Sequence, residues 1–260
     1  MRRHLVTLAM LLAIGAIGPR ASAAPILAFD INDRTEGETA SDPSINTAPG
    51  FSPYTISSGT NSTGVVDGYT VNFDVFDDHD PVNDGGSTTT DSPGAFDDRD
   101  RVVPTTAPTL NQLYDDFIFV GNSAGLTGGV DLTISGGALL PNTPYFVSIY
   151  AYDGISASMG TNTPVRSAAW FDGNNLDAPV LTTTFTVNVP PVTDDQYKFT
   201  GIALTDAAGA LFLKGRRVTA ADVAVYVNGV EVNAIPEPAS LGLAFATLAM
   251  IGVARLQRQH

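Results

Sequence analysis

The chain has 260 residues, no cysteine, and 27 Asp or Glu residues against 13 Lys or Arg residues, for a formal charge of −14. Without cysteine there is no disulfide, no thiolate metal site and no cysteine nucleophile, and the strong negative charge argues against nucleic acid and anionic lipid as partners. Hydrophobic residues make up 43% of the sequence, which is enough for a folded core and argues against a disordered chain.

Residues 1–23 have the layout of a secretory signal peptide. Two arginines precede a long apolar stretch, and Ala21-Ser22-Ala23 provides the small residues of a cleavage site. Between Ala24 and Pro236, eight Lys or Arg residues oppose 26 Asp or Glu residues, a formal charge of −18. We therefore expect an acidic folded domain over residues 24–234 that is secreted.

The first half of this domain contains two clear strand patterns separated by polar sequence. Residues 26–31 form a short apolar run, and residues 69–76 alternate apolar and polar side chains, which indicates a strand with one solvent-facing side. Residues 32–67 are rich in Gly, Pro, Ser and Thr, so we expect a long surface excursion there with one short strand around residues 54–56. A long acidic loop is expected over residues 77–101.

The second half contains short strand-like runs at regular spacing, with Gly, Pro, Asn and Asp between them. One helical turn is expected over residues 109–114, and Asn228-Gly229 predicts a two-residue hairpin turn before a last strand over residues 230–232. This pattern predicts an all-β fold, a jelly-roll-like β-sandwich. The other expected strands are residues 116–120, 130–135, 145–152, 167–171, 180–189, 196–205, 210–213 and 222–227.

Two of these stretches carry a resemblance to a known fold. In residues 139–150 a turn with two prolines feeds a strongly patterned strand, and residues 223–230 read Val-Ala-Val-Tyr-Val-Asn-Gly-Val. This layout resembles galactose-binding-like and malectin-like jelly rolls. The resemblance implies a jelly-roll sandwich and, as an activity, sugar binding.

An acidic cluster that leads into the acidic loop is a candidate calcium site. Calcium takes about six to eight oxygen ligands, and Asp and Asn side chains together with backbone carbonyls can supply them. The spacing lacks the Gly and the final Glu of a complete EF-hand, and a solvated loop of mutually repelling acids is the competing interpretation. The candidate ligands are Asp74, Asp77, Asp78, Asp80, Asn83 and Asp84.

The single tryptophan suggests a sugar site. Trp170 is followed by Asp172 and Asn174, and a sugar ring that stacks on an aromatic side chain can form hydrogen bonds with nearby Asp and Asn. Core packing is the competing interpretation, because sandwich cores also bury Tyr and Trp with their polar tips paired. The same two interpretations apply to one face of the strand over residues 145–152, which carries Phe146, Ser148, Tyr150 and Tyr152.

Catalytic chemistry has few candidates in this domain. His79 is the one histidine between the two predicted targeting segments, which excludes a three-histidine zinc site. Its acidic loop, flanked by proline, is a poor support for a Ser-His-Asp triad. Abundant Asp residues leave a carboxylate pair, as in glycoside hydrolases, as an alternative. We expect a non-catalytic protein.

Residues 235–260 have the order of parts of a sorting signal. Pro236-Glu237-Pro238 ends the folded domain, because the two prolines cannot continue a strand. An uncharged segment follows over residues 239–254, and Arg255 and Arg258 lie behind it. This order resembles the PEP-CTERM signal of bacterial surface proteins. The resemblance implies that Pro236, Glu237 and Pro238 are recognised by an exosortase-type transpeptidase, and that the uncharged segment crosses the inner membrane transiently with its arginines on the cytoplasmic side.

Together these features predict a secreted protein that is delivered to the cell envelope or extracellular surface and has a structural or adhesive role in the surface matrix. A carbohydrate-binding module for exopolysaccharide is the first alternative, and a glycoside hydrolase-like enzyme is the second. Calcium is the expected cofactor if the acidic cluster binds a metal, and the expected partners include no nucleic acid.

Overall fold

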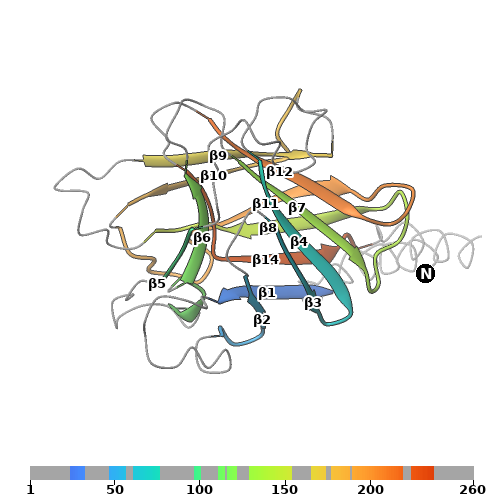
Figure 1. Cartoon of the computed structure of the whole chain (residues 1–260), viewed down its shortest axis with the longest axis horizontal. Coiled ribbons are helices and arrows are strands. Elements are labelled where there is room, and N and C mark those ends of the chain that lie inside the picture. Colours follow the sequence, from blue (N-terminus) through green and yellow to red (C-terminus); the bar gives the residue numbers. More distant parts are fainter. Residues whose placement is uncertain are drawn as a thin grey trace, which may run out of the picture.

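A computed structural model shows an all-β fold of packed sheets (Figure 1). The predicted signal peptide and the predicted membrane segment lie outside the residues that the structure describes. Within the described part of the chain, no helix is long and apolar enough to cross a membrane. The described residues are 24–32, 47–56, 61–76, 97–100, 111–114, 116–121, 129–153, 165–173, 177–187, 189–218 and 224–236.

The described residues form fourteen strands and one short 3-10 helix, η1. In chain order they are β1 (Leu27–Asn32), β2 (Ser52–Thr55), β3 (Asn61–Val66), β4 (Tyr69–Phe76), β5 (Asp97–Asp100), η1 (Asn111–Tyr114), β6 (Asp116–Gly121), β7 (Gly129–Gly136), β8 (Pro144–Tyr150), β9 (Val165–Asp172), β10 (Leu181–Thr186), β11 (Lys198–Leu204), β12 (Leu211–Arg217), β13 (Ala224–Val227) and β14 (Gly229–Ala234).

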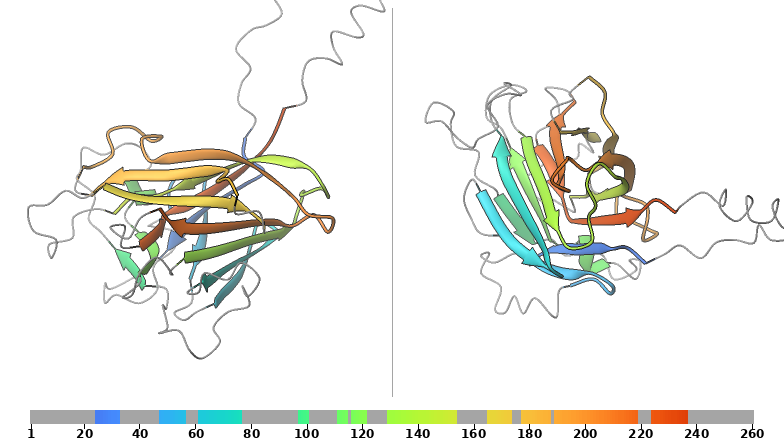
Figure 2. Two further views of the ribbon diagram at one scale, coloured as in Figure 1. Left: turned by 90° about the horizontal axis from the view of Figure 1, so that it is seen from above. Right: turned by 90° about the vertical axis from the view of Figure 1, so that its right-hand side faces the viewer.

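Two of the three sheets pack face to face in a sandwich-like arrangement (Figures 1 and 2). One sheet has the strand order β11-β8-β14-β1-β2, and the other has the order β10-β9-β12-β7-β4-β3. Along β4, Val71, Phe73 and Val75 are buried in the main core, whereas Thr70 is exposed on the opposite face. This alternation is the one that residues 69–76 predicted, and the all-β prediction is confirmed.

The edges of the two sheets meet along both sides of the sandwich. β10 contacts β11 on one side, and β2 contacts β3 on the other. Gly201 in β11 permits the first contact, because a Cβ at this position would lie 2.2 Å from the carbonyl oxygen of Val180. Closing the sides in this way reduces the length of unpaired strand edge that other molecules can reach.

The third sheet, β13-β6-β5, lies with η1 at the left-hand end of the molecule in Figure 1. Aromatic side chains from these elements pack against the end of β8 and the segment that precedes β11, and they form a second core. Its buried members are Ala48, Leu113, Tyr114, Phe117, Tyr150, Ala151, Tyr152, Phe185, Val187, Tyr197, Ala224 and Tyr226.

The predicted hairpin at Asn228-Gly229 is wrong. β13 pairs with β6, whereas β14 pairs with β8 and β1, so the two strands belong to different sheets. Asn228 lies at the corner between them. Its backbone N–H donates to the carbonyl of Tyr150, and its side-chain oxygen accepts a hydrogen bond from the backbone N–H of Tyr152. The Asn-Gly pair therefore marks a chain that changes sheets.

Two strands lie where the sequence predicted irregular structure. β3 lies within the predicted surface excursion, and β5 lies within the predicted acidic loop. β3 forms a hairpin with β4 through Asp67 and Gly68, which both have positive φ. A two-residue turn of this kind requires positive φ at both positions, and Asp-Gly adopts it readily.

Both ends of the folded domain lie at one end of the sandwich. The N–H of Ile26 donates to the carbonyl of Val232, so the start of β1 and the end of β14 are neighbours, as Figure 2 shows. We call this the terminal end of the domain. The turns at residues 67–68, 137–143 and 205–210 lie there too, because they join strand ends that pair next to β14 or next to one another.

Candidate functional site

Trp170, the central residue of the predicted sugar site, is not on the surface. It lies on the inward face of β9 and has no exposed area. Its ring packs against Gly215 of β12, where a Cβ would lie 2.9 Å from the ring. A sugar ring cannot stack on a side chain that solvent does not reach, so the structure favours the core-packing interpretation.

Asp172, the second predicted sugar ligand, connects the two sheets. Its Oδ2 accepts a hydrogen bond of 2.9 Å from the backbone N–H of Leu204 in β11. The third predicted ligand, Asn174, lies outside the described residues. Of the three candidates, the structure thus places Trp170 in the core and gives Asp172 a contact that holds β9 to β11.

The tyrosine-rich face of β8 is also a packing surface. Tyr150 and Tyr152 are buried in the second core. The Tyr152 ring stacks on Tyr197 with 4.9 Å between ring centroids, and the edge of Tyr114 meets Tyr150 and Tyr152 at 6.2 and 5.9 Å. These rings bind η1 and the segment that precedes β11 to the sandwich, and they leave no open platform for a ligand at these tyrosines.

Burial raises the pKa of five tyrosine hydroxyls above the ordinary value of 10, and for Tyr150 the negative charge of Glu231 adds to the effect. The protonated hydroxyls of Tyr54, Tyr114, Tyr150 and Tyr197 serve as hydrogen-bond donors. Tyr114 donates to the carbonyl of Asp194 at 2.7 Å. We refer to the five as the buried tyrosines: Tyr54, Tyr114, Tyr150, Tyr152 and Tyr197.

Asp74 is the one candidate calcium ligand within the described residues, and it lies in a strand. It is directly opposite Asp131 of β7 in the antiparallel register, and Asp131 is opposite Lys214 of β12. Asp131 also forms a buried ion pair of 2.7 Å with Arg216. Asp74, Asp131 and Lys214 thus form a row across the outer face of the sheet, in which positively charged side chains lie beside the carboxylates.

The remaining candidate calcium ligands, at positions 77, 78, 80, 83 and 84, lie outside the described residues, so the calcium site stays a prediction. In the parts of the chain that the structure describes, no group of three or more His, Cys, Asp or Glu side chains is arranged to hold a metal.

Asp74 and Asp131 bring two carboxylates together, which is the feature that a hydrolase would need. Side chains directly opposite in an antiparallel pair have Cβ atoms about 4.5–5.5 Å apart. Asp131, however, is 4% exposed and holds Arg216 with one oxygen. A glycosidic bond cannot reach it in this conformation, so the pair does not favour the hydrolase alternative.

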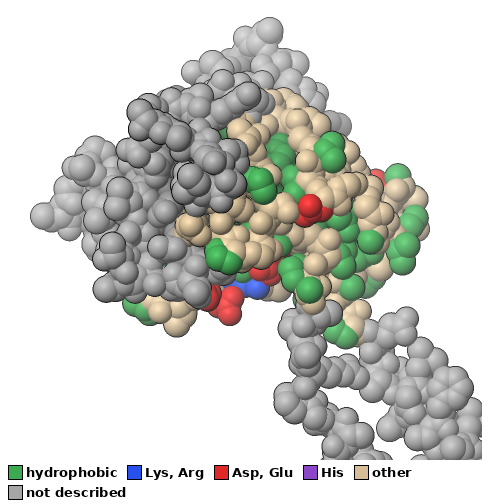
Figure 3. All heavy atoms as spheres, turned by 90° about the horizontal axis from the view of Figure 1, so that it is seen from below, with side chains coloured by type: hydrophobic (Ala, Val, Ile, Leu, Met, Phe, Trp, Pro, Cys, Tyr) green, Lys and Arg blue, Asp and Glu red, His purple; other side chains and the backbone are tan. Residues whose placement is uncertain are grey.

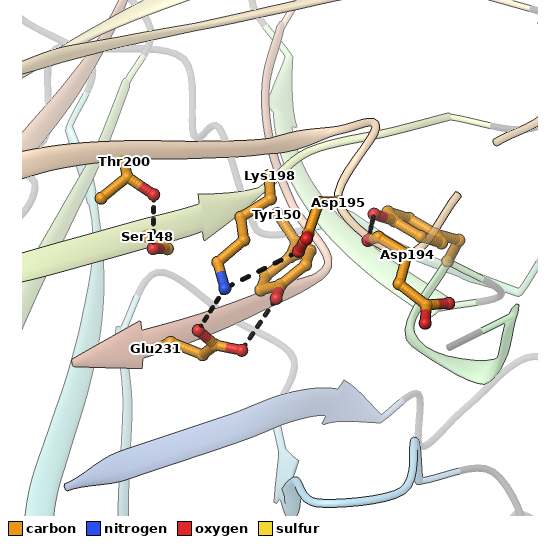
Figure 4. A network of polar contacts seen from close by, with 8 residues as sticks. Ser148, Tyr150, Asp194, Asp195, Lys198, Thr200 and Glu231 are labelled. Carbon is orange, nitrogen blue, oxygen red and sulfur yellow. Dashed lines mark hydrogen bonds and ion pairs between the residues drawn. The ribbon is translucent and has the colours of Figure 1, made fainter. Parts of the chain in front are cut away.

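A polar network that the sequence did not reveal lies on the outer face of the other sheet (Figure 4). One carboxylate oxygen of Glu231 accepts a hydrogen bond of 2.8 Å from the Tyr150 hydroxyl, and the other forms an ion pair of 2.6 Å with the Lys198 ammonium. Asp195 approaches the same ammonium to 3.8 Å, but its side chain is 78% exposed. Both oxygens of Glu231 are therefore occupied.

Strand register explains how these residues meet. β11, β8 and β14 are neighbours, with Lys198 opposite Tyr150 and Ser148 opposite both Thr200 and Glu231. The Ser148 and Thr200 hydroxyls form a hydrogen bond of 2.7 Å in the row next to the ion pair. Because these polar groups bind one another, we assign the network a structural role and not a ligand-binding one. It fixes the alignment of three strands.

The cationic side chains that the structure describes are largely withdrawn from solvent. Lys214, Arg166, Arg216 and Arg217 are at most 7% exposed, and the side chain of Lys198 is 24% exposed. On the face shown in Figure 3, a single small area of Lys or Arg surface is visible among the described residues, and it borders Asp or Glu surface. Four acids, Asp30, Asp131, Asp153 and Glu231, are buried as well. The exposed charges among the residues whose burial is described are all Asp side chains.

The predicted sorting motif begins where the described fold ends. β14 ends at Ala234, and Pro236 is exposed two residues later, while Glu237 and Pro238 lie outside the described residues. No protein-family model, curated protein or solved structure matches this chain. The functional argument therefore depends on the sequence motifs and on the geometry described above.

Proposed function

We propose that this chain is a secreted, non-catalytic surface protein with a jelly-roll-like domain, which a PEP-CTERM signal delivers to the cell envelope for a structural or adhesive role in the surface matrix. One observation carries the proposal. Pro236-Glu237-Pro238, the uncharged residues 239–254, and Arg255 with Arg258 follow one another in the order of that signal. An exosortase-type transpeptidase is the proposed partner.

The position of the motif supports this proposal. A processing enzyme needs an extended and accessible peptide, and the chain leaves the last strand at Ala234, with Pro236 exposed. Ile26, which follows the predicted signal peptide closely, lies beside Val232. The described fold therefore begins and ends at the terminal end, so removal of the two proposed targeting segments should leave the sheets intact.

The charge distribution supports a role outside the cell. Most of the described cations are buried, so the surface is strongly anionic and repels nucleic acid and other anionic polymers. Divalent cations in an extracellular matrix screen such a surface, and calcium bound by the acidic loop would add a specific contact. The buried positions of Trp170 and Asp131 give the sugar-binding and hydrolase alternatives no support at those residues.

Mass spectrometry of envelope material from cells that express the chain tests the sorting proposal. The mature protein should lack residues 241–260, and Glu237→Ala should leave an unprocessed form in the inner membrane. Asp195→Ala is the matched control, because Asp195 is an exposed acid away from the motif, and this variant should be processed normally. An intact C-terminus in the native envelope fraction would show that the proposal is wrong.

A further inference from the structure

The outer face of β11 changes from apolar to polar with distance from the terminal end. Leu204 and Ile202, nearest that end, are 50% and 51% exposed. Thr200 and Lys198 follow on the same face, and Lys198 belongs to the network with Glu231. An apolar side chain at half exposure is ordinary when it is alone, but several together mark an interaction surface.

Neighbouring elements extend this apolar area. Phe146 of β8 lies opposite Ile202, and Pro144 lies opposite Leu204. Leu140, in the turn that precedes β8, is 61% exposed, and its carbonyl accepts a hydrogen bond from Thr205, the residue after Leu204. We name this area the terminal apolar surface: Leu140, Pro144, Phe146, Ile202 and Leu204.

The length of the chain limits what this surface can face. Ala234 pairs with Tyr145, next to Pro144 and Phe146 in β8, so the chain leaves the sheet beside the terminal apolar surface. Ala239, where the uncharged segment begins, lies five residues further along the chain than Ala234. Even fully extended, these residues span at most about 18 Å. While the uncharged segment is in a membrane, this end of the domain is held close to the membrane surface.

The acids at the edge of this surface are bound by backbone groups. Asp172 accepts a hydrogen bond from the N–H of Leu204, and Asp206 accepts from the N–H groups of Ala208 and Ala210. The acidic loop, in contrast, follows β4 at Phe76, and β4 runs away from the terminal end. The domain thus presents its apolar end where the chain is anchored and its acidic loop begins at the opposite end.

We propose that the terminal apolar surface rests in the interface of the lipid bilayer while the C-terminal segment is anchored. The inference depends on the proposed function, because it requires residues 239–254 to lie in the membrane. Apolar side chains at such an interface sit about 5–10 Å into the boundary between head groups and acyl chains. The contact orients the precursor and holds Pro236 at the membrane surface, where the proposed transpeptidase would meet it.

Fluorescent labels at single cysteines test this orientation, since the chain has no cysteine of its own. Ile202→Cys and Leu140→Cys each place an environment-sensitive dye on the surface. Val192→Cys is the matched control, since Val192 is 78% exposed and precedes β11 at the end away from the termini. The full-length chain is reconstituted into phosphatidylcholine vesicles with and without brominated acyl chains. Dyes at positions 202 and 140 should shift to shorter wavelength and lose intensity with brominated lipid, whereas the dye at 192 should not change.

Flotation of the vesicles separates failure of this inference from failure of the proposed function. If the full-length chain does not float with lipid, the membrane anchor is absent and the proposed function fails. If it floats while the dyes at positions 202 and 140 stay in water, only the inference about the surface is overturned. Quenching of the dyes at all three positions would overturn the proposed orientation. If the dye at position 202 becomes shielded from water without lipid, as protein concentration rises, the surface binds a second copy of the chain and the inference is overturned.

Discussion

Replacing Glu231 with Gln tests the polar network on the outer face. The change keeps the size of the side chain but removes its charge, so Lys198 loses an ion-pair partner at 2.6 Å and the Tyr150 hydroxyl loses a charged acceptor at 2.8 Å. Hydrogen bonds to charged groups contribute about 1.5–3 kcal/mol. The Lys198 side chain is 24% exposed, so water replaces part of what it loses. We expect the free energy of unfolding to fall by about 2 kcal/mol.

Asp195→Asn is the matched control for this substitution, because it removes the other carboxylate near the same lysine. That carboxylate lies 3.8 Å from the Lys198 ammonium and is 78% exposed. Exposed ion pairs contribute about 0–1 kcal/mol and are screened by salt, so we expect a loss below about 0.5 kcal/mol. Urea denaturation of residues 24–236, followed by far-UV circular dichroism at low and high salt, measures both variants. Equal losses, or a Glu231→Gln effect that salt abolishes, would refute the reasoning.

The buried tyrosines should make the domain unstable in alkali. Their pKa is raised in the folded state, so stability is fully present below about pH 10 and falls above it, by up to about 1.4 kcal/mol per pH unit for each tyrosine that is ionised only in the unfolded state. Tyrosinate absorbance should therefore rise together with the loss of circular dichroism, and ionisation in a folded domain near pH 10 would contradict this. Gly215→Ala should cost about 1–3 kcal/mol, because the added Cβ meets the ring of Trp170; the native fluorescence of that single tryptophan should resist iodide, and strong quenching would disprove its burial. Millimolar calcium should raise the melting temperature more than magnesium, or sodium chloride at equal ionic strength, and Asp78→Asn with Asp80→Asn should remove the difference. If sodium chloride gives the whole shift, the acidic loop holds only a solvated cluster of charge.

Strands with a clean alternation were predictable from sequence, and polar strands were not. β4 occupies the residues that the alternating pattern predicted, because every second side chain enters the main core. β3, with the sequence Asn-Ser-Thr-Gly-Val-Val, has too few large apolar side chains to show that pattern. The Asp67-Gly68 turn beside it was the available signal, since Asp-Gly next to an alternating strand is typical of a hairpin. β5 consists of four charged residues, so its sequence has no apolar pattern that predicts a strand. It forms a strand because its backbone pairs with β6.

The direction in which Trp170 points could not be predicted from the sequence of β9. The inward set of this strand includes Arg166 and Ala168 as well as Trp170, and all three are buried. The outward set includes Ser167 and Phe171, which are partly exposed. Because each face carries both a polar and an aromatic residue, periodicity alone does not say which face enters the core.

The polar network depends on information that a single sequence does not contain. Tyr150 and Glu231 are 81 residues apart, and they meet only because β8 and β14 are adjacent in a particular register. A shift of one residue would turn Glu231 into the core. The network therefore selects the register in which β8, β11 and β14 pair. Its sequence signal is a lone Glu between two valines in β14. This pattern predicts that Glu231 faces away from the core, but it does not predict which residues Glu231 contacts.

The way charge is distributed over the domain connects its folding with its proposed role. The buried cations include Arg216, which forms an ion pair with Asp131, and the partly buried Lys198 forms an ion pair with Glu231. These cations stabilise pairs of strands. Among the residues whose burial is described, Asp67, Asp177, Asp195 and Asp206 are exposed, whereas no Lys or Arg is. Such a surface repels copies of itself and anionic lipid at ordinary ionic strength. The terminal apolar surface is then the part of the described domain best suited to approach a membrane, and it lies where the chain continues toward its uncharged segment. In the proposed function, the domain loses this membrane contact once the segment is removed, and calcium bound by the acidic loop would then join it to its partner in the matrix.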